Sequence, residues 1–341
     1  MKIKIIGGGW YGCHLASSLL ADDHDVTLFE KTGSLFSGAS GANQSRTHLG
    51  FHYPRCKKTR NESRAGHREF MEKYGELTKE IPCNIYAIAS DVSLIDFKTY
   101  RDIMAASGND FLTLAPGDHG LTNIEGAVVT GERLILQIHT KRMFERLLAG
   151  HIIYSTYEDM SEYGSSAKEG VDRTYDLVLN CTYGALPTPG VARYEPCVLY
   201  IYEGRQEYAC TVMDGPFGVS MYPYFEDGYV SLTSVEHTPI AICDSFQEAQ
   251  SAVAEAEAYT GWLDKNRNAM EDRMAHYLPW FRDNYRYRSH SIAIRSLPGS
   301  AADRRTCHCY RDGNVVSVLP GKISGIFKIE REIKEIIDDC G

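Results

Sequence analysis

The sequence lacks the short motifs that mark several common enzyme classes. It has no Gly-x-Ser-x-Gly nucleophile elbow and no His-Glu-x-x-His zinc motif, and Gly321-Lys322 is followed by Ile323 instead of the Ser or Thr of a Walker loop. None of its ten cysteines form a Cys-x-x-Cys pair, and the spacing of Cys307 and Cys309 fits no common zinc site. We therefore expect no metal site, and structural cysteines that stay reduced in the cytoplasm.

Excess positive charge and long apolar runs are missing too. The chain has 36 Lys and Arg residues against 45 Asp and Glu residues, a formal net charge of −9 at pH 7, which excludes a general nucleic-acid-coating protein. The uncharged run from Ile5 to Ala21 is interrupted by glycines and by polar residues such as His14, so it predicts neither a signal peptide nor a membrane span. With 341 residues, the chain is long enough for about two domains.

A glycine-rich turn near the N-terminus is the first positive signal. The strand expected at 2–6 is followed by Gly7-Gly-Gly9-Trp-Tyr-Gly12, which opens a helix and fits the dinucleotide pattern G-x-G-x-x-G. Gly7 allows a tight turn, Gly9 lets a pyrophosphate approach, and Gly12 permits close packing of helix on strand. The helix N-terminus supplies N–H groups for phosphates. Glu30, at the end of the next strand, can bind both ribose hydroxyls and would repel a 2′-phosphate. The pattern does not distinguish an NAD-binding site from an FAD-binding site.

Hydrophobic periodicity predicts further strands and helices along the chain, and the type of sheet that it predicts changes near residue 198. Residues 33–54 are expected to form a loop, and the continuous apolar run 176–180 suits the middle of a parallel sheet. Residues 198–234 are rich in Tyr, Val and Thr and contain Asp-Gly turns, which indicates an antiparallel sheet. The other expected strands are 26–30, 84–89, 111–114, 127–130, 134–138, 292–295 and 314–318, and the expected helices are 12–22, 60–79, 94–106, 141–148, 246–259, 265–276 and 323–337.

Residues 37–54 read Ser-Gly-Ala-Ser-Gly-Ala-Asn-Gln-Ser-Arg-Thr-His-Leu-Gly-Phe-His-Tyr-Pro. Together with the glycine turn and Glu30, this segment resembles the FAD-dependent D-amino-acid oxidase-like (DAO) superfamily, near the glycine oxidase and L-2-hydroxyglutarate oxidase-like branch. Residues 176–184, the pair Ile294-Arg295 and residues 319–324 resemble further segments of that superfamily. Two positions depart from its pattern: Pro320-Gly321 stands in place of Gly-Gly, and Arg295 is followed by Ser instead of Pro.

The resemblance implies an α/β fold with two interleaved domains. A Rossmann-like FAD-binding domain would comprise 1–80, 139–190 and 292–341, and an antiparallel-sheet substrate domain would comprise 81–138 and 191–291. FAD would be the cofactor. Its expected contacts are Gly7, Gly9, Trp10, Tyr11, Gly12, Glu30, Lys31, Ser40, Asn43, Gln44, Ser45, Arg46, Thr47, Thr182, Gly184, Arg295, Gly321, Lys322, Ile323 and Ser324.

Three side chains are the candidates for chemistry. His48 and His52 lie on the expected flavin-facing loop, where a neutral imidazole can take a substrate proton; the alternatives are a covalent link to FAD or a structural role. Arg295 can bind a substrate carboxylate bidentately, or form an interdomain ion pair instead. The expected substrate contacts are Arg46, Tyr53, Tyr222, Tyr224 and His237, with core packing as the alternative for the last three.

The resemblance implies an oxidoreductase that oxidises an amine or amino acid to an imine, with oxygen or a quinone as electron acceptor. Three alternatives stay open: a 2-hydroxy-acid dehydrogenase, an enzyme for an amino acid attached to a nucleotide or nucleic-acid base, as in phage-type base modification, and a non-catalytic flavin- or NAD-binding protein. Residues 45–68 and 282–311 are rich in Arg and Lys, which favours an anionic substrate. The alternative is that these cations pair with the acidic region 244–272.

Overall fold

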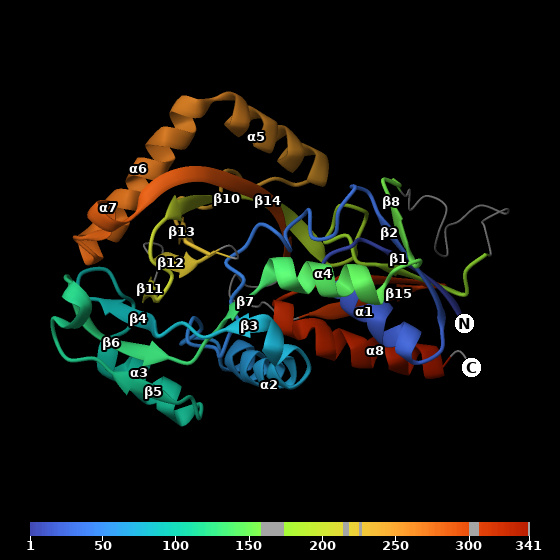
Figure 1. Cartoon of the computed structure of the whole chain (residues 1–341), viewed down its shortest axis with the longest axis horizontal. Helices are drawn as coiled ribbons and strands as arrows, with labels where there is room; N and C mark the ends of the chain where they lie inside the picture. The colour runs from blue at the N-terminus through green and yellow to red at the C-terminus, as the bar shows by residue number, and fades with distance from the viewer. Residues whose placement is uncertain (158–173, 214–217, 225–226, 300–306, 340–341) are drawn as a thin grey trace.

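A computed structural model describes residues 1–157, 174–213, 218–224, 227–299 and 307–339. The described chain forms two large sheets that lie next to each other (Figure 1). One sheet has six strands in the order β15-β16-β9-β1-β2-β8, and the other has eight in the order β14-β10-β13-β12-β11-β4-β6-β5. A two-stranded ladder of β3 (Thr78–Lys79) and β7 (Leu134–Ile135) completes the strand pairing. The α/β class predicted from the sequence is confirmed.

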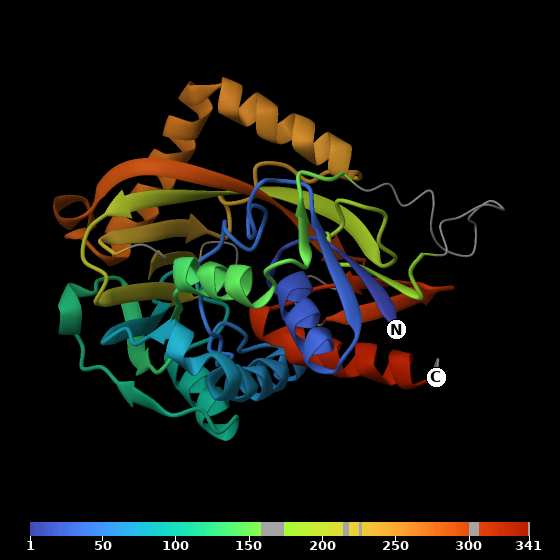
Figure 2. The same ribbon diagram turned by 45° about the vertical axis from the view of Figure 1, so that its right-hand side comes forward.

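The six-stranded sheet is parallel except at one edge. Its central strand β1 is flanked by β2 and β9, and both neighbours run parallel to it. Helices α1 and α8 pack against each other and against this sheet (Figure 2). They bury an apolar core that includes Ile5, Leu179 and Ile333. The elements are β1 (Lys2–Ile6), α1 (Trp10–Ala21), β2 (Asp25–Glu30), α4 (Gln137–Leu147), β8 (Ile152–Tyr154), β9 (Leu177–Asn180), β15 (His308–Asp312), β16 (Val315–Leu319) and α8 (Ile326–Asp338).

The eight-stranded sheet is antiparallel except where β11 pairs with β4. Strand residues alternate between its faces. Val198, Tyr200 and Tyr202 of β10 point into a core with α6, so Cys197 and Leu199 point to the opposite face. The elements are α2 (Lys57–Tyr74), β4 (Cys83–Ala89), α3 (Phe97–Ala106), β5 (Phe111–Thr113), β6 (Ile124–Thr130), β10 (Val191–Glu203), β11 (Tyr208–Met213), β12 (Val219–Pro223), β13 (Tyr229–Ser234), α5 (Phe246–Ala258), α6 (Thr260–Tyr277), α7 (Phe281–Asn284) and β14 (Arg286–Pro298). Short 3₁₀ turns occupy Gly75–Leu77, Asp118–Gly120 and Ile323–Gly325.

Several expected boundaries were wrong. The helix expected from residue 94 begins at Phe97, because the Asp96 carboxylate accepts the N–H of Thr99 and caps it. The strand expected at 134–138 ends at Ile135, and α4 follows at once; so short an apolar run fits both periodicities. Strands β3, β8 and β15 were not expected from the sequence.

The six-stranded sheet draws its strands from the segments expected for the FAD-binding domain. Strand β14 runs unbroken to Pro298, so the domain boundary expected at residue 292 falls inside a strand of the other sheet. A membrane-spanning segment is absent from the described helices, since none has both the length and the apolar character that crossing a bilayer requires.

Candidate active site

The glycine turn between β1 and α1 has no space for side chains. Gly7 has a φ of +109°, and a Cβ there would lie 2.7 Å from the carbonyl oxygen of Cys181. A Cβ on Gly12 would lie 1.9 Å from the carbonyl oxygen of Gly7, because the first turn of α1 packs directly on the end of β1. Both positions therefore require glycine, as the dinucleotide pattern predicts.

Glu30 ends β2 beside this turn, and hydrogen bonds fix its carboxylate. Oε2 accepts the backbone N–H of Gly8 at 2.8 Å, while Oε1 accepts the backbone N–H and the hydroxyl of Thr32 at 2.9 and 2.8 Å. The carboxylate lies in a cavity wall, where it can accept hydrogen bonds from two ribose hydroxyls. The glycine turn, the start of α1 and Glu30 thus fit the adenosine and pyrophosphate of FAD.

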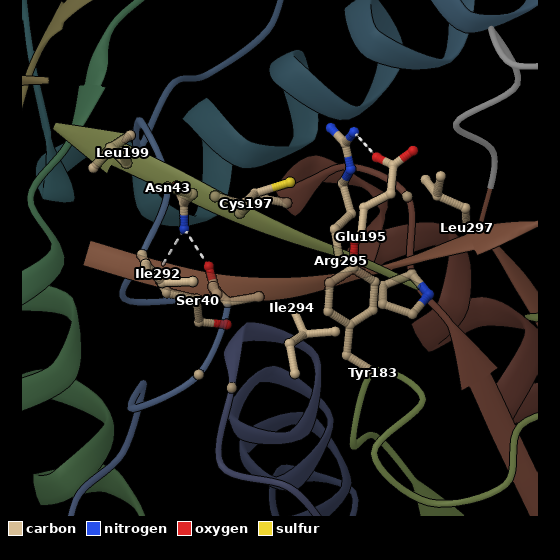
Figure 3. Close-up of a pocket in the computed structure, with 18 of the residues that line it drawn as sticks. Ser40, Asn43, Tyr183, Glu195, Cys197, Leu199, Ile292, Ile294, Arg295 and Leu297 are labelled. Atoms are coloured by element: carbon tan, nitrogen blue, oxygen red, sulfur yellow. Dashed lines mark hydrogen bonds and ion pairs between the residues drawn. The ribbon is translucent and has the colours of Figure 1, made fainter. Parts of the chain in front are cut away.

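Ser40 and Asn43 shape the segment that follows β2. The Ser40 hydroxyl accepts the backbone N–H of Trp10 at 3.0 Å and so caps the first turn of α1. Asn43 Nδ2 donates to the carbonyl oxygens of Ala39 and Ser40, both at 2.8 Å, and Asn43 Oδ1 accepts the N–H of Ser45 at 2.6 Å (Figure 3). These bonds hold a tight turn from which the chain reaches the eight-stranded sheet.

A cavity of about 1770 Å³ extends from the glycine turn to that sheet. Cavities that hold one drug-sized ligand are about 300–1,000 Å³, so this one has room for a dinucleotide and a second molecule. The cavity brings together most of the residues predicted from the sequence. These are Gly7, Gly9, Trp10, Tyr11, Glu30, Lys31, Ser40, Asn43, Gln44, Ser45, Arg46, His48, His52, Tyr53, Thr182, Arg295, Gly321, Lys322 and Ile323.

Seven predicted residues are not among the described residues that line the cavity: Gly12, Thr47, Gly184, Ser324, Tyr222, Tyr224 and His237. The last three were expected to contact substrate. Tyr222 is fully buried and lies under the Arg46 guanidinium, and Tyr224 reaches the carbonyl oxygen of Gly41 at 3.4 Å. His237 lies in the turn after β13, where its ring is 3.7 Å from the Glu236 carboxylate. The structure places these three side chains in packing or turn contacts.

Arg46 connects the loop to the eight-stranded sheet. Its terminal nitrogens donate to the Tyr86 hydroxyl at 2.7 Å, to Thr211 Oγ1 at 3.0 Å and to Ser220 Oγ at 2.9 Å. The guanidinium carbon lies 3.9 Å from the centre of the Tyr222 ring. The side chain is 2% exposed, and its terminal nitrogens are bound to protein groups. Arg46 therefore fixes the position of the loop, with little capacity left to bind a substrate carboxylate.

Glu132, between β6 and β7, is a buried carboxylate that no sequence motif marks. Its side chain is fully buried and lies 4.0 Å from Arg46 Nη1 and 3.8 Å from His48 Nδ1. It accepts the backbone N–H of Leu49 at 2.8 Å and the hydroxyl of Tyr86 at 2.6 Å. Glu132 thus balances the buried guanidinium and holds the chain directly after His48.

His48 is the best-placed base in the cavity. Burial holds its pKa well below the ordinary value, and the positive charges of Lys322 and Arg46 lower the pKa further. The imidazole is therefore neutral at pH 7. Nε2 lies 3.4 Å from Lys322 Nζ. His52 and Tyr53 adjoin it, with ring centres 6.4 and 6.3 Å from that of His48. The arrangement provides a proton acceptor beside a cation at one end of the cavity.

Arg295 is paired with a carboxylate that the sequence did not reveal. Arg295 in β14 and Glu195 in β10 are directly opposed in the antiparallel register, and Arg295 Nη2 donates to Glu195 Oε2 (Figure 3). Both side chains line the cavity. No local pattern signals this pair, since the partners are 100 positions apart.

The basic segments are largely engaged within the protein. Arg282 pairs with Glu271 and Asp272. This agrees with the alternative that the cations pair with the acidic region 244–272. Arg60 and Arg64 of α2 donate to backbone carbonyl oxygens. Arg304 and Arg305 lie outside the described residues. These contacts weaken the argument from the basic segments for an anionic substrate.

Comparison with known proteins places these features in a family. Residues 2–182 match the family model described as FAD dependent oxidoreductase (DAO). The chain is 38% identical to "FAD-dependent monooxygenase FPY4" of Fusarium mangiferae, over 99% of this chain and 91% of that protein. It is 26% identical to "FAD-dependent monooxygenase kojA" of Aspergillus flavus, over 99% and 86%.

Solved structures share the fold at low identity. Glycine oxidase from Geobacillus kaustophilus matches with a TM-score of 0.66 and 15% identity, over 99% of this chain and 94% of that one. L-alpha-glycerophosphate oxidase from Mycoplasma pneumoniae, with FAD bound, matches with a TM-score of 0.70 and 15% identity, over 99% and 94%. The family match and the 38% identical relative confirm FAD as cofactor and the oxidoreductase class, against the non-catalytic alternative. The chain belongs to the DAO family of FAD-dependent oxidoreductases.

Proposed function

We propose that this enzyme oxidises a C–H bond next to a hydroxyl or an uncharged amino group, with His48 as the proton acceptor. FAD, when bound, supplies the hydride acceptor at its N5 atom. The neutral imidazole of His48, facing the cavity beside Lys322, is the observation that carries the proposal. It can take the O–H or N–H proton while the hydride leaves.

The charge around His48 favours a hydroxyl over an ammonium group. Lys322 and Arg46 both raise the positive potential at the imidazole, against the carboxylate of Glu132. A cationic amine is repelled there and would have to bind as the free base, whereas a hydroxyl is neutral and any negative charge that develops on its oxygen is stabilised. Amine or amino-acid oxidation, which the family resemblance implies, is therefore the second candidate.

Monooxygenation is a further candidate, favoured by the names of the two fungal relatives. Both are called FAD-dependent monooxygenases, and one shares 38% of its aligned residues with this chain. Oxidation of a C–H bond by hydride removal adds no oxygen atom from O₂ to the product. Product formed under ¹⁸O₂ therefore separates the two reactions, with labelled product indicating monooxygenation.

The decisive experiment is anaerobic bleaching of the oxidised flavin in the purified holoenzyme. The panel should contain matched pairs that differ only in the oxidisable group, such as alcohols with amines and hydroxy acids with amino acids, together with nucleotide-linked amino acids. We expect alcohols to bleach the flavin faster than the matched amines. Faster bleaching by amines at all pH values would overturn the preference for hydroxyl groups.

The role of His48 is tested by His48→Gln, which keeps a polar side chain but removes the basic nitrogen. We expect bleaching by an active substrate to slow by about 10²–10⁴-fold, the usual contribution of a general base. His276→Gln, in α6 and 41% exposed, is the matched control and should bleach at the wild-type rate. An unchanged rate in His48→Gln would refute this assignment.

The reoxidation partner and the location of the enzyme are also proposals. Oxygen consumption after bleaching would identify an oxidase, and reoxidation only by a soluble quinone would identify a dehydrogenase. A cytoplasmic location rests on the sequence argument that the cysteines stay reduced.

A further inference from the structure

We propose that Glu195 serves as an internal ligand of Arg295 and makes the cavity select substrates without a carboxylate group. The substrate class is then a neutral, hydroxyl-bearing compound. This inference rests on the proposed oxidation of a C–H bond next to a hydroxyl, and it assigns Glu195 as a specificity determinant.

The strand register holds Glu195 and Arg295 next to each other in the cavity wall. Glu195 and Arg295 are opposed partners on adjacent antiparallel strands, on the same sheet face as Cys197 and Leu199 (Figure 3). The Glu195 side chain is 12% exposed and that of Arg295 35%, so both are partly shielded from bulk water. A charged hydrogen bond at such a site is stronger than one on the surface.

The pair opposes binding of a carboxylate at this position. A substrate carboxylate could reach Arg295 only by displacing Glu195, which would leave the Glu195 charge unpaired in the wall. Removing one partner from a shielded ion pair is strongly unfavourable. If Glu195 instead stayed in place, the two carboxylates would repel each other across one guanidinium.

A neutral group meets no such penalty. The Arg295 side chain is 35% exposed and has N–H groups besides the one that Nη2 donates to Glu195, so it can also donate to a hydroxyl or carbonyl oxygen. Farther along the same sheet, Thr211, Ser220 and Thr233 stand in register on β11, β12 and β13 and line the cavity. Their hydroxyls are bonded within the protein, to Arg46, to each other or to the Ser220 carbonyl oxygen, so this stretch of the wall presents neutral side chains and no further carboxylate.

Binding of benzoate and benzyl alcohol to the holoenzyme, measured by calorimetry, tests the inference. Wild type should bind benzyl alcohol more tightly than benzoate. Glu195→Gln frees the guanidinium and should tighten benzoate binding at least about tenfold while leaving benzyl alcohol nearly unchanged. Adding Arg295→Gln should abolish the gain. Glu203→Gln, which removes the exposed partner of Arg288 on the same strand, is the matched control and should bind both ligands as wild type does.

Two results would overturn the inference. One is tighter binding of benzoate than of benzyl alcohol by wild type, a comparison that needs no variant to fold. The other is unchanged benzoate binding in a folded Glu195→Gln holoenzyme. If Arg295→Gln also fails to retain FAD in that case, Arg295 binds the cofactor and not the substrate. Because these are binding measurements, they are separate from the bleaching assay, whose failure would refute the proposed oxidation alone.

Discussion

Replacing Glu132 with alanine should destabilise the protein severely, although the residue does not line the cavity. The change removes the acceptor for the N–H of Leu49 and the hydroxyl of Tyr86. It also removes the carboxylate that lies 4.0 Å from the buried Arg46 guanidinium. Two buried donors and one buried cation would be left without this partner.

The expected magnitude follows from these contacts. Breaking a buried ion pair by deleting one member costs about 3–5 kcal/mol, and each buried donor left unsatisfied costs about 1–3 kcal/mol. The two costs overlap at the same atoms, so we expect Glu132→Ala to lose about 4 kcal/mol of unfolding free energy. Glu132→Gln keeps an acceptor of the same shape and should lose about half as much. Such a loss is a large share of the 5–15 kcal/mol of a typical domain.

Urea unfolding of the holoprotein, followed by circular dichroism and by flavin release, measures these changes. The control is Glu80→Gln, since the Glu80 side chain is 81% exposed and pairs with Arg133 at the surface. Its cost should stay below about 1 kcal/mol. A loss below about 1 kcal/mol in Glu132→Ala would refute the idea that this carboxylate compensates the buried guanidinium.

Three further predictions concern cofactor, loop and pH. Gly12→Ala should abolish retention of FAD on purification, because its Cβ would lie 1.9 Å from the Gly7 carbonyl oxygen; Gly33→Ala, with no described atom within 4 Å of the added Cβ, should retain it. Arg46→Lys should lower kcat/KM for an active substrate at least about tenfold, since lysine cannot reproduce the fork that holds the loop; equal kcat/KM would contradict this. Burial lowers the pKa of His67 to about 4, so the folded state resists the proton that the unfolded chain takes up below about pH 6.5. Stability should therefore fall as pH drops from 6.5 toward 4, and His67→Gln should make the urea midpoint less pH-dependent over that range; a parallel pH profile would argue against it.

Local patterns predicted the strand-turn-helix-strand unit that carries the glycine turn and Glu30. The glycine turn and Glu30 form one continuous strand-turn-helix-strand unit, so their spacing in the sequence determines their spacing in the structure. The start of α3 also depends on a local signal, the cap formed by Asp96, which the expected start at residue 94 overlooked. These features depend on neighbours within about one supersecondary unit.

Contacts between segments far apart in the sequence depend on strand register, which no local pattern specifies. Glu132 meets His48 across 84 positions of chain, and Glu195 meets Arg295 across 100. Arg295 was recognisable as a functional candidate, but its partner was not. The sequence indicated that Arg46 belongs to the site, but it did not indicate what Arg46 binds. Its N–H groups donate to Tyr86, Thr211 and Ser220, which lie on three separate strands.

The order of strands in the six-stranded sheet has a consequence for synthesis on the ribosome. β1 and α1 emerge first, yet β16 and α8, which complete the sheet and cover α1, come from residues 315–338. Because translation adds about 5–20 residues per second, the apolar face of α1 stays without its partner helix for roughly 15–60 seconds. Gly321 and Lys322, which also line the cavity, arrive in the same late segment. We therefore expect flavin capture to be a late event in the maturation of this chain, with the nascent N-terminal half exposed to aggregation until then.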